Sequence, residues 1–501
     1  MCKIKMGSSK HHIVMLPYMA HGHLIPFLAL AKKIHHTTGF TITIANTPLN
    51  IKYLRSTFNS LDVLSGDINL VELPFSPAAE FGLPPNTEST ENVPDSLIGH
   101  FFSSSIALKN PLHDLLSGIA DKEGKSPLCL ISDLALGFWA NDVAKSLGIV
   151  NLTFNTCGAY GILGVISLWL NLPHRKVINS DSDSDEFHVP GFPENCRFRI
   201  SQLNPFLRNA DGTDVWSKIR QQQFSNSLQS DGWLCNTVEE IEPLGLELLR
   251  NYVKIPVWSV GPLLPAELLA NSTEKPSKHV GKQSGIPAEI CVAWLDLQEP
   301  CSVLYISFGS QNSINPAQMM ELATGLEKSG KPFIWVIRPP TGFDRKSEFR
   351  SEWLPKGFEE QITSTKQGLL VRNWGSQLEI LSHKSTGAFL SHCGWNSVME
   401  SLSQGVPIIG WPLASEQPYN SKMLVEEMGV SVELGRGLES DISSEDVKNV
   451  IEEVMDRKGK GREMRKNAME ARNLIIGSVK ENGSSPRVLN DLIAMLLSTT
   501  T

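Results

Sequence analysis

Several side chains that can bind a nucleotide sugar lie between residues 374 and 417 of this sequence. The segment FLSHCGWNSVMES runs from an apolar strand (residues 388–390) through a polar turn into a helix that we expect to begin near Asn396. The free N–H groups and the positive end of such a helix favour a phosphate. His392 and Ser397 add side-chain donors at the same place.

Two neighbouring residues fit the rest of such a ligand. Trp374 follows a predicted strand (residues 368–371), where its indole could stack on a flat base. Glu400 lies one turn into the helix and can accept hydrogen bonds from vicinal hydroxyls. A base, a phosphate and hydroxyls together describe a nucleotide sugar.

The 44 residues from Trp374 to Gln417 resemble the signature box of plant family 1 UDP-glycosyltransferases. That box begins with Trp, ends with Gln and has HCGWNS in the middle, as this segment does. One difference is visible, because the family usually opens Trp-Ala-Pro-Gln and this chain has Gly375-Ser376 as the middle pair. The family contacts uracil there through its backbone, so we expect the contact to be retained on a looser loop.

The resemblance implies a set of donor contacts. In this set Trp374 stacks on uracil, and Gly375 meets the base through its backbone. The ribose is bound by Gln377 and Glu400, and the diphosphate by His392, Ser397 and the N–H of Asn396. The residues that face the sugar are Trp395, Glu416 and Gln417. Trp at the first of these sugar positions and Gln at the last fit UDP-glucose. Arg at the first would suggest a glucuronate, and His at the last a galactose.

Two turns outside the box complete the expected donor site. The FGSQ turn that follows the strand over residues 303–307 resembles the SFGS turn that lies by the diphosphate in the family. There Gly309 permits close backbone approach and Ser310 can donate. In relatives a Thr at the position of Thr156 touches the sugar 6-hydroxyl, and its alternative role is a helix cap.

The candidate catalytic base is a histidine in the turn AHGHLIP, residues 20–26, after the first strand. Histidine has a pKa suited to general-base work near neutrality. The family has a GHxxP motif here, which implies that His23 deprotonates the acceptor hydroxyl. The alternative is a solvated loop histidine, and His21 is the rival, interpreted as a neighbouring cleft or surface residue.

The base needs a group that orients it. Asp133 ends a strand (residues 128–132) on the same sheet edge as His23. In the family this Asp hydrogen-bonds the His and stabilises its protonated form, as the acid of a Ser-His-Asp triad does. Asp133 could also cap a helix over residues 136–147, and the two roles do not exclude each other.

The elements that position these residues alternate between short apolar strands and longer helical patterns, which predicts an α/β fold with doubly wound parallel sheets. The other predicted strands cover residues 13–16, 41–45, 70–73, 150–154, 333–337 and 407–410. Two such series suggest two Rossmann-like domains, and the resemblance implies the GT-B arrangement with a cleft between them. We expect an acceptor domain over residues 1–262, a linker over 263–287, a donor domain over 288–485 and a last helix, within 486–501, that crosses back to the first domain.

Composition limits the partners. The 501 residues carry a formal net charge of −8 without a basic run, which argues against nucleic acid. Eight cysteines without CxxC pairs indicate buried free thiols in a reducing compartment. Because no segment reads as a signal peptide or a membrane span, we expect a cytoplasmic monomer.

The combined expectation is an inverting glucosyltransferase that needs no cofactor and no metal. The only DxD-like run, around Asp181 and Asp183, lies in a polar loop and is interpreted as solvated. The acceptor is expected to be a small, largely apolar plant metabolite such as a flavonoid, phenolic or terpenoid. Its binding loops (residues 75–101 and 174–207) do not identify it.

Four alternatives remain. They are another UDP-sugar such as xylose or galactose, a C- or N-linked product, a nicotinamide-dependent oxidoreductase, and a non-catalytic binding protein. The oxidoreductase lacks its glycine fingerprint in both strand-following turns. The binding protein is disfavoured because His23 and Asp133 are both present.

Overall fold

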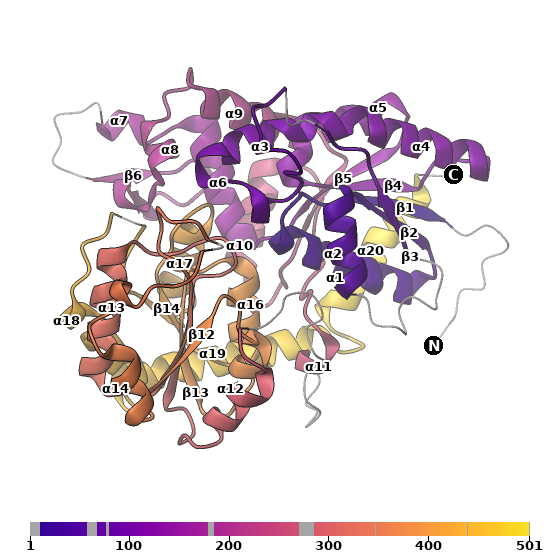
Figure 1. Cartoon of the computed structure of the whole chain (residues 1–501). Helices are drawn as coiled ribbons and strands as arrows, with labels where there is room; N and C mark the ends of the chain where they lie inside the picture. Colours follow the sequence, from indigo (N-terminus) through magenta and orange to yellow (C-terminus); the bar gives the residue numbers. More distant parts are fainter. Residues whose placement is uncertain are drawn as a thin grey trace.

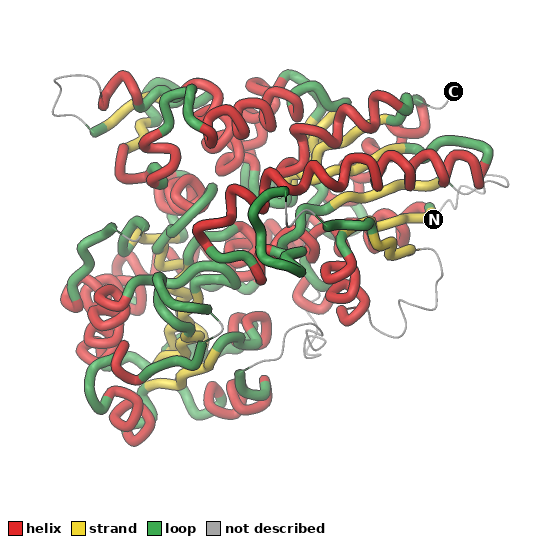
Figure 2. Tube along the Cα trace, turned by 45° about the horizontal axis from the view of Figure 1, so that its top comes forward, coloured by secondary structure: helices red, strands yellow, loops and turns green. Residues whose placement is uncertain are grey.

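The computed structural model describes residues 11–57, 68–76, 80–178, 185–269, 285–345, 347–437 and 439–499. These residues form two larger parallel β-sheets, each enclosed by helices (Figure 1, Figure 2). One sheet is built from the N-terminal half of the chain and the other from the C-terminal half. The expected α/β architecture is confirmed.

The N-terminal sheet has seven parallel strands in the order β3-β2-β1-β4-β5-β8-β9. Its central strands are apolar and buried along their whole length, as in other parallel sheets that are covered on both faces. In register, Met15 of β1 lies opposite Ile44 of β2 and Ile131 of β4. The strands are β1 (His12–Leu16), β2 (Thr41–Asn46), β3 (Ile68–Glu72), β4 (Cys129–Asp133), β5 (Val150–Asn155), β8 (Gly232–Cys235) and β9 (Val257–Ser259).

The C-terminal sheet has six parallel strands in the order β12-β11-β10-β13-β14-β15. Ile306 of β10 lies opposite Trp335 of β11 and Leu390 of β13. The strands are β10 (Val303–Ser307), β11 (Phe333–Ile337), β12 (Gly368–Arg372), β13 (Thr386–Ser391), β14 (Ile408–Gly410) and β15 (Ser431–Glu433). A separate antiparallel pair, β6 (Glu186–His188) and β7 (Arg197–Arg199), belongs to the N-terminal half.

Helices connect the strands of both sheets. In the N-terminal half they are α1 (His21–Thr38), α2 (Pro48–Thr57), α3 (Ile98–Ser104), α4 (Lys109–Glu123), α5 (Gly137–Ser146), α6 (Ala159–Asn171), α7 (Arg175–Ile178), α8 (Pro205–Asn209), α9 (Val215–Ser227) and α10 (Pro243–Val253). The later helices are α11 (Ala266–Leu269), α12 (Ala288–Leu295), α13 (Pro316–Ser329), α14 (Phe358–Ser364), α15 (Gln377–Leu381), α16 (Trp395–Ser403), α17 (Gln417–Glu426), α18 (Ser444–Met455), α19 (Gly459–Ser478) and α20 (Ser484–Ser498).

Each predicted strand corresponds to an observed one. Five short strands were not predicted, namely β6, β7, β8, β9 and β15, each of only three or four residues. The expected helix in the signature segment is α16, which begins at Trp395, one residue before the predicted start. Gly405 follows it with a φ of 71°, as expected for a glycine just after a helix.

The last helix, α20, packs against the N-terminal sheet. Its Leu489 and Leu492 belong to the same buried core as Ile13 and Phe27. Lys33 of α1 donates to the Ser485 hydroxyl at 2.5 Å and to the Val260 carbonyl at 2.7 Å. The domain limits at residues 262, 287 and 485 stay predictions, and residues 270–284 of the expected linker lie outside the described part of the chain.

The two halves also touch directly where α6 meets α17 (Figure 1). A Cβ atom on Gly161 would lie 2.0 Å from the Asn420 side-chain oxygen, and one on Gly164 would lie 3.0 Å from the Tyr419 ring. Glycine is therefore required on α6 for the N-terminal half to approach α17, which begins at Gln417.

The cysteines differ in part from the expectation. Cys129, Cys235, Cys291 and Cys393 are buried free thiols, but Cys157 and Cys196 are partly exposed and Cys301 is exposed. The expectation of burial was wrong for these three because each lies outside the strands and helices. Among the helices of the described residues, none combines the length and apolar character that crossing a membrane requires.

Candidate active site

The candidate base and its orienting acid meet at the carboxyl edge of the N-terminal sheet. β1 and β4 are parallel neighbours, so the turn after β1 and the end of β4 share that edge. His23 Nδ1 lies 2.8 Å from Asp133 Oδ2. The backbone N–H of Ala135 donates to Asp133 Oδ1 at 2.9 Å. Asp133 therefore contacts His23 as expected, but it caps the short 3-10 helix Leu134–Leu136. The expected cap of the following helix was wrong, because α5 begins only at Gly137, after that 3-10 turn.

The electrostatics of this pair favour a charged imidazole. Asp133 has only 2% of its side chain exposed, whereas His23 has 32% exposed. Burial lowers the pKa of His23, but the charge and hydrogen bond of Asp133 and the charge of Glu416 together raise it, so the pKa lies above its usual value. Since Nδ1 is occupied by Asp133, Nε2 is the atom left to receive a proton.

The rival histidine lies in a different environment. His21 stacks on the Tyr53 ring with centroids 3.7 Å apart, and its Nδ1 lies 3.5 Å from Glu91 Oε1. These two contacts place His21 between α2 and the segment around residue 91. These contacts match the expectation of a neighbouring residue.

A closed hydrogen-bond network joins the residues expected at the ribose. Gln377 Nε2 donates to the Ser397 hydroxyl at 3.0 Å and to Glu400 Oε2 at 2.5 Å. The Tyr305 hydroxyl donates to Gln377 Oε1 at 3.2 Å. Burial raises the pKa of Glu400 to about 7. The sequence analysis missed Tyr305, which points from the middle of β10 toward this network.

The turns expected at the diphosphate are packed on one another. His392 follows β13, and a Cβ atom on Gly309 would lie 2.5 Å from His392 Nε2. Gly309 also has a φ of 73°, so both its conformation and its surroundings require glycine. At the start of α16, Gly394 offers no side chain to the free N–H groups, which leaves them available to an anion.

A partly buried arginine that was not predicted from the sequence holds this turn. Arg338 follows β11 and donates to the backbone carbonyls of Gly309, Ser310 and Asn312. Burial lowers the pKa of Arg338 to about 10, and burial together with Arg338 lowers the pKa of His392 to about 4. His392 is therefore a neutral imidazole at physiological pH. The position of Arg338 directly after an apolar strand is the signal that could have revealed it.

Two residues of α16 bridge to the N-terminal half. Trp395 is 2% exposed, and its Nε1 donates to the Asn236 carbonyl at 2.6 Å. The Asn396 side chain donates to the Gly22 carbonyl at 3.0 Å. The indole N–H of Trp395 is thus already engaged, which leaves only its ring to face a sugar. For Asn396, the backbone N–H is the group that remains for a phosphate.

The last two residues of the signature segment, Glu416 and Gln417, offer different hydrogen-bonding groups to a ligand. Gln417 Oε1 accepts from the backbone N–H groups of Leu413 and Ala414, both at 2.9 Å. Its amide nitrogen is therefore the group left for a sugar, which narrows the expectation that it could face a ligand as both donor and acceptor. Glu416 is 9% exposed and its charge raises the pKa of His23, so it lies near the catalytic pair.

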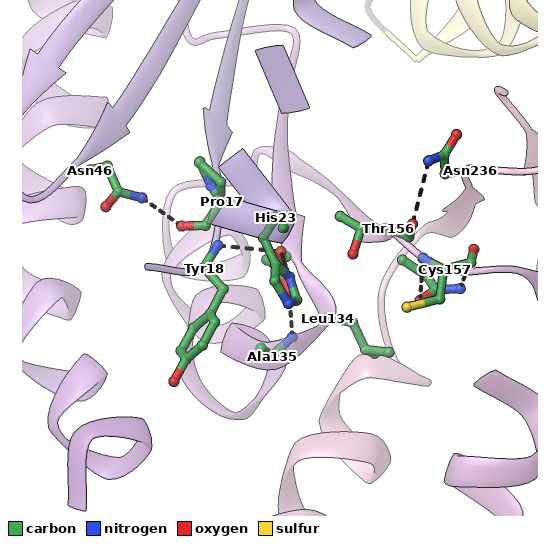
Figure 3. A network of polar contacts seen from close by, with 12 residues as sticks. Pro17, Tyr18, His23, Asn46, Leu134, Ala135, Thr156, Cys157 and Asn236 are labelled. Carbon is green, nitrogen blue, oxygen red and sulfur yellow. Dashed lines mark hydrogen bonds and ion pairs between the residues drawn. The ribbon is translucent and has the colours of Figure 1, made fainter. Parts of the chain in front are cut away.

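Thr156 lies on the N-terminal side of the same region. It follows β5 and is buried, and its carbonyl accepts from the Asn236 amide at 3.5 Å (Figure 3). Burial together with the neighbouring Glu416 raises the pKa of the thiol of Cys157, the residue after Thr156. Thr156 and Glu416 are therefore close to each other across the two halves.

The packing around Gly375 explains why the signature segment departs from the family pattern at its start. Trp374 is partly exposed after β12, and its carbonyl accepts from Gly285 N–H at 2.8 Å. Gly375 is buried, and a Cβ atom there would lie 2.7 Å from Val336 Cγ2. The alanine that usually occupies this position would not fit without movement of Val336.

The Asp-rich run is not tested by the structure, since residues 179–184 lie outside the described part. In the described ranges no group of three or more His, Cys, Asp or Glu side chains is arranged to hold a metal ion. The expectation of a metal-free reaction stays a prediction.

Comparisons with known proteins agree with the resemblance. The family described as "UDP-glucoronosyl and UDP-glucosyl transferase" matches residues 214–474, and the family "Glycosyltransferase, N-terminal domain" matches residues 9–189. UDP-glycosyltransferase 92A1 of Arabidopsis thaliana is 42% identical over 92% of each chain. Crocetin glucosyltransferase 3 of Crocus sativus is 41% identical over 97% of this chain and 99% of its own.

Solved structures of similar proteins share the whole fold. UGT73P12 of Glycyrrhiza uralensis, complexed with glycyrrhetinic acid 3-O-monoglucuronide, has a TM-score of 0.82 and 27% identity, with 98% of this chain and 96% of that chain covered. UGT71G1 of Medicago truncatula, complexed with UDP-glucose, has a TM-score of 0.77 and 25% identity over 97% and 98%. UGT89C1 of Arabidopsis thaliana, complexed with UDP-L-rhamnose, has a TM-score of 0.73 and 26% identity over 98% and 100%.

Proposed function

The chain belongs to the plant family 1 UDP-glycosyltransferases, which have the GT-B fold, and from this premise we propose that it is an inverting glucosyltransferase. It transfers glucose from UDP-glucose to a hydroxyl of a small plant secondary metabolite. The observation that carries the proposal is the contact of 2.8 Å between His23 and Asp133 at the edge of the sheet that faces the signature segment.

The proposed reaction is a single displacement. His23 Nε2 removes the proton from the acceptor hydroxyl as its oxygen attacks the anomeric carbon, and UDP leaves with the bonding electrons. Asp133 stabilises the imidazolium that forms, since its carboxylate already raises the pKa of His23. One displacement on an α-linked donor produces a β-linked glucoside.

The choice of glucose rests on the last residues of the signature segment. With its oxygen engaged by backbone N–H groups, Gln417 is a pure donor, and Glu416 beside it is an acceptor for neighbouring sugar hydroxyls. A relative bound to UDP-glucose supports this choice, whereas a relative bound to UDP-L-rhamnose shows that the family also binds another sugar. A crocetin glucosyltransferase among the relatives supports glucose as well.

We propose that the leaving diphosphate is stabilised without a metal. The N–H groups at the start of α16 and the neutral His392 are fixed donors, and preorganised donors can stabilise developing charge by several kcal/mol. The seven described cysteines are all free, which supports a reducing compartment such as the cytoplasm. A monomer stays the prediction for the assembly.

The test is a transfer assay with purified protein, UDP-glucose and a panel of phenols and terpenoid alcohols. We expect UDP release coupled to products that are heavier by one hexose, with alkali-stable β linkages. The absence of product with every acceptor, while UDP-glucose still binds in calorimetry, would instead support a non-catalytic binding protein. A parallel assay with UDP-rhamnose, UDP-xylose and UDP-galactose measures the donor preference.

A further inference from the structure

A guanidinium lies near the catalytic pair without a carboxylate partner. Arg220 of α9 is partly exposed, and its Cζ lies 4.7 Å from the centre of the Phe102 ring and 5.5 Å from that of Trp216. Within the described ranges, no Asp or Glu side chain forms an ion pair with Arg220. Burial lowers the pKa of Arg220 to about 10, as expected for a charge taken from water without an opposite charge beside it.

Two hydrogen bonds link this guanidinium to the residue that follows Asp133. One of its terminal nitrogens donates to Gln223 Oε1 at 2.9 Å. Gln223 is buried and donates to the Leu134 carbonyl at 3.0 Å. Leu134 directly follows Asp133 in the chain. The same short segment therefore orients both His23 and, through Gln223, Arg220.

Aromatic rings connect the guanidinium with the base. The Tyr18 ring lies edge-on to His23 with centroids 5.5 Å apart, and it lies 6.0 Å from the Phe102 ring on which Arg220 stacks. Figure 3 shows the Tyr18 side chain beside His23. Burial raises the pKa of Tyr18 and the charge of Arg220 lowers it, so the phenol and the guanidinium are close in space.

A purely structural role for Arg220 would engage only part of its guanidinium. Stacking on Phe102 and Trp216 uses the faces of the guanidinium. The edge of the group carries five N–H donors, and the hydrogen bond to Gln223 uses one of them. Arg220 is partly exposed, so its remaining donors are open to water or to a ligand.

We propose that the acceptor carries a carboxylate, which binds the free edge of Arg220 and the Tyr18 hydroxyl while the acceptor hydroxyl lies at His23. This inference rests on the proposed function and names its substrate class as hydroxylated carboxylic acids. Arginine suits this task because its planar fork matches a carboxylate with two parallel hydrogen bonds. Two aromatic contacts separate the base from Arg220, so the hydroxyl and the carboxylate belong at opposite ends of the acceptor.

The experiment compares hydroxy acids with their own methyl esters. The pairs are 4-hydroxycinnamic acid, 4-hydroxybenzoic acid and a hydroxylated triterpenoid acid, each with its ester. The ratio of kcat/KM for acid over ester is measured with UDP-glucose in the wild type, Arg220→Gln, Arg220→Lys and Lys218→Gln. Lys218 is the matched control because it lies on the exposed side of the same helix and carries the same charge.

We expect the wild type to prefer the acids. Arg220→Gln should lower the acid-to-ester ratio roughly 10- to 100-fold, as expected when a hydrogen bond to a charged group is lost. Arg220→Lys should lower it by less, because the charge remains while the fork is lost. Lys218→Gln should keep the wild-type ratio, and the product should be an alkali-stable hydroxyl glucoside.

The outcomes separate this inference from the proposed function. No glucoside with any acceptor would contradict the proposed function itself. Glucosides formed without a preference for acids, equal losses on acids and esters in Arg220→Gln, or an alkali-labile glucose ester as the product would each contradict the inference alone. If Arg220→Gln does not fold by circular dichroism, the wild-type ratio and Arg220→Lys decide the question.

Discussion

In the C-terminal half, four of the polar side chains proposed to bind UDP-glucose (Gln377, Ser397, Glu400 and Gln417) already hydrogen-bond to one another or to the backbone. Gln377 joins Ser397 and Glu400, and Gln417 holds its own turn. On the N-terminal sheet, the proposed acceptor side consists of the His23–Asp133 pair, aromatic rings and Arg220. The donor side is preorganised for one ligand class, whereas the acceptor side provides one reactive pair within a mainly apolar surface.

This difference predicts that the protein discriminates more strictly among donors than among acceptors. A network of fixed hydrogen bonds discriminates sharply, because an analogue that lacks one partner leaves a buried polar group unsatisfied. An aromatic surface discriminates weakly, since a missing methylene costs only about 1–3 kcal/mol. The acceptor side can therefore change its substrate by exchange of a few side chains, whereas the network of Gln377, Ser397 and Glu400 is expected to keep the nucleotide and to leave only the sugar open to change.

The largest expected effect belongs to the reactive pair. His23→Ala should lose roughly 10²- to 10⁴-fold in turnover, the usual contribution of one general base, and should keep its affinity for UDP. Turnover and calorimetry with UDP measure the two quantities. His21→Ala is the matched control. The assignment is wrong if His21→Ala causes the loss and His23→Ala does not.

The orienting acid should control the pH dependence. Asp133 raises the pKa of His23, so the neutral base is lost as the pH falls through that raised value. Asp133→Asn keeps an oxygen for the Ala135 cap but removes the charge, so the acid limb of kcat/KM should move to lower pH and turnover should fall roughly 10²-fold. An acid limb that stays in place would show that Asp133 does not act on the titrating group.

The donor side should divide into nucleotide and sugar contacts. Glu400→Ala removes the carboxylate of the ribose network and should weaken UDP binding roughly 10- to 100-fold. Gln417→Ala should lower turnover with UDP-glucose and leave the affinity for UDP nearly unchanged, because its free amide nitrogen is directed at the sugar. Calorimetry with UDP on both variants decides, and equal losses of UDP affinity would contradict the division.

A smaller effect is expected at Gly375. Gly375→Ala would place a Cβ atom 2.7 Å from Val336 Cγ2, and overpacking of this kind costs about 1–3 kcal/mol of unfolding free energy. Urea unfolding measures the loss. The double variant Gly375→Ala with Val336→Ala provides the control, because it removes the clashing methyl group. A single variant as stable as the wild type would mean that Val336 moves freely.

The smallest expected effect is that of metal removal. Activity should persist in excess EDTA, and replacement of Asp181, Asp183 and Asp185 by Asn should leave turnover almost unchanged. The physical reason is that fixed N–H groups and His392 supply the stabilisation of the diphosphate. Loss of activity in EDTA that Mg²⁺ or Mn²⁺ restores would overturn the metal-free mechanism.

The sequence predicts best where chemistry is tied to the end of a strand. His23 and Asp133 were expected on one sheet edge, and β1 and β4 bring them together. Arg338 and Tyr305 were missed, although both follow or belong to strands of the same sheet, because arginine and tyrosine at such positions have many ordinary roles.

Contacts between distant segments were beyond prediction. Arg220 stacks on Phe102, and Trp395 binds the Asn236 carbonyl, across separations that no local pattern encodes. The sequence showed Gly375 as a backbone contact to the base and as a departure from the family pattern, but the reason for the departure lies in Val336 on a neighbouring strand. Packing between elements, and not propensity within them, decides these features.

The central claim is that His23 removes a proton from the acceptor. The most direct test measures how much transfer rate His23→Ala loses with acceptors of increasing acidity. Single-turnover transfer from UDP-glucose is measured with an alkyl alcohol, a weakly acidic phenol and a nitrophenol that is already ionised at the assay pH. We predict a large loss with the alcohol, a smaller loss with the phenol and almost none with the ionised nitrophenol, which needs no base. An equal loss with all three acceptors would contradict the account.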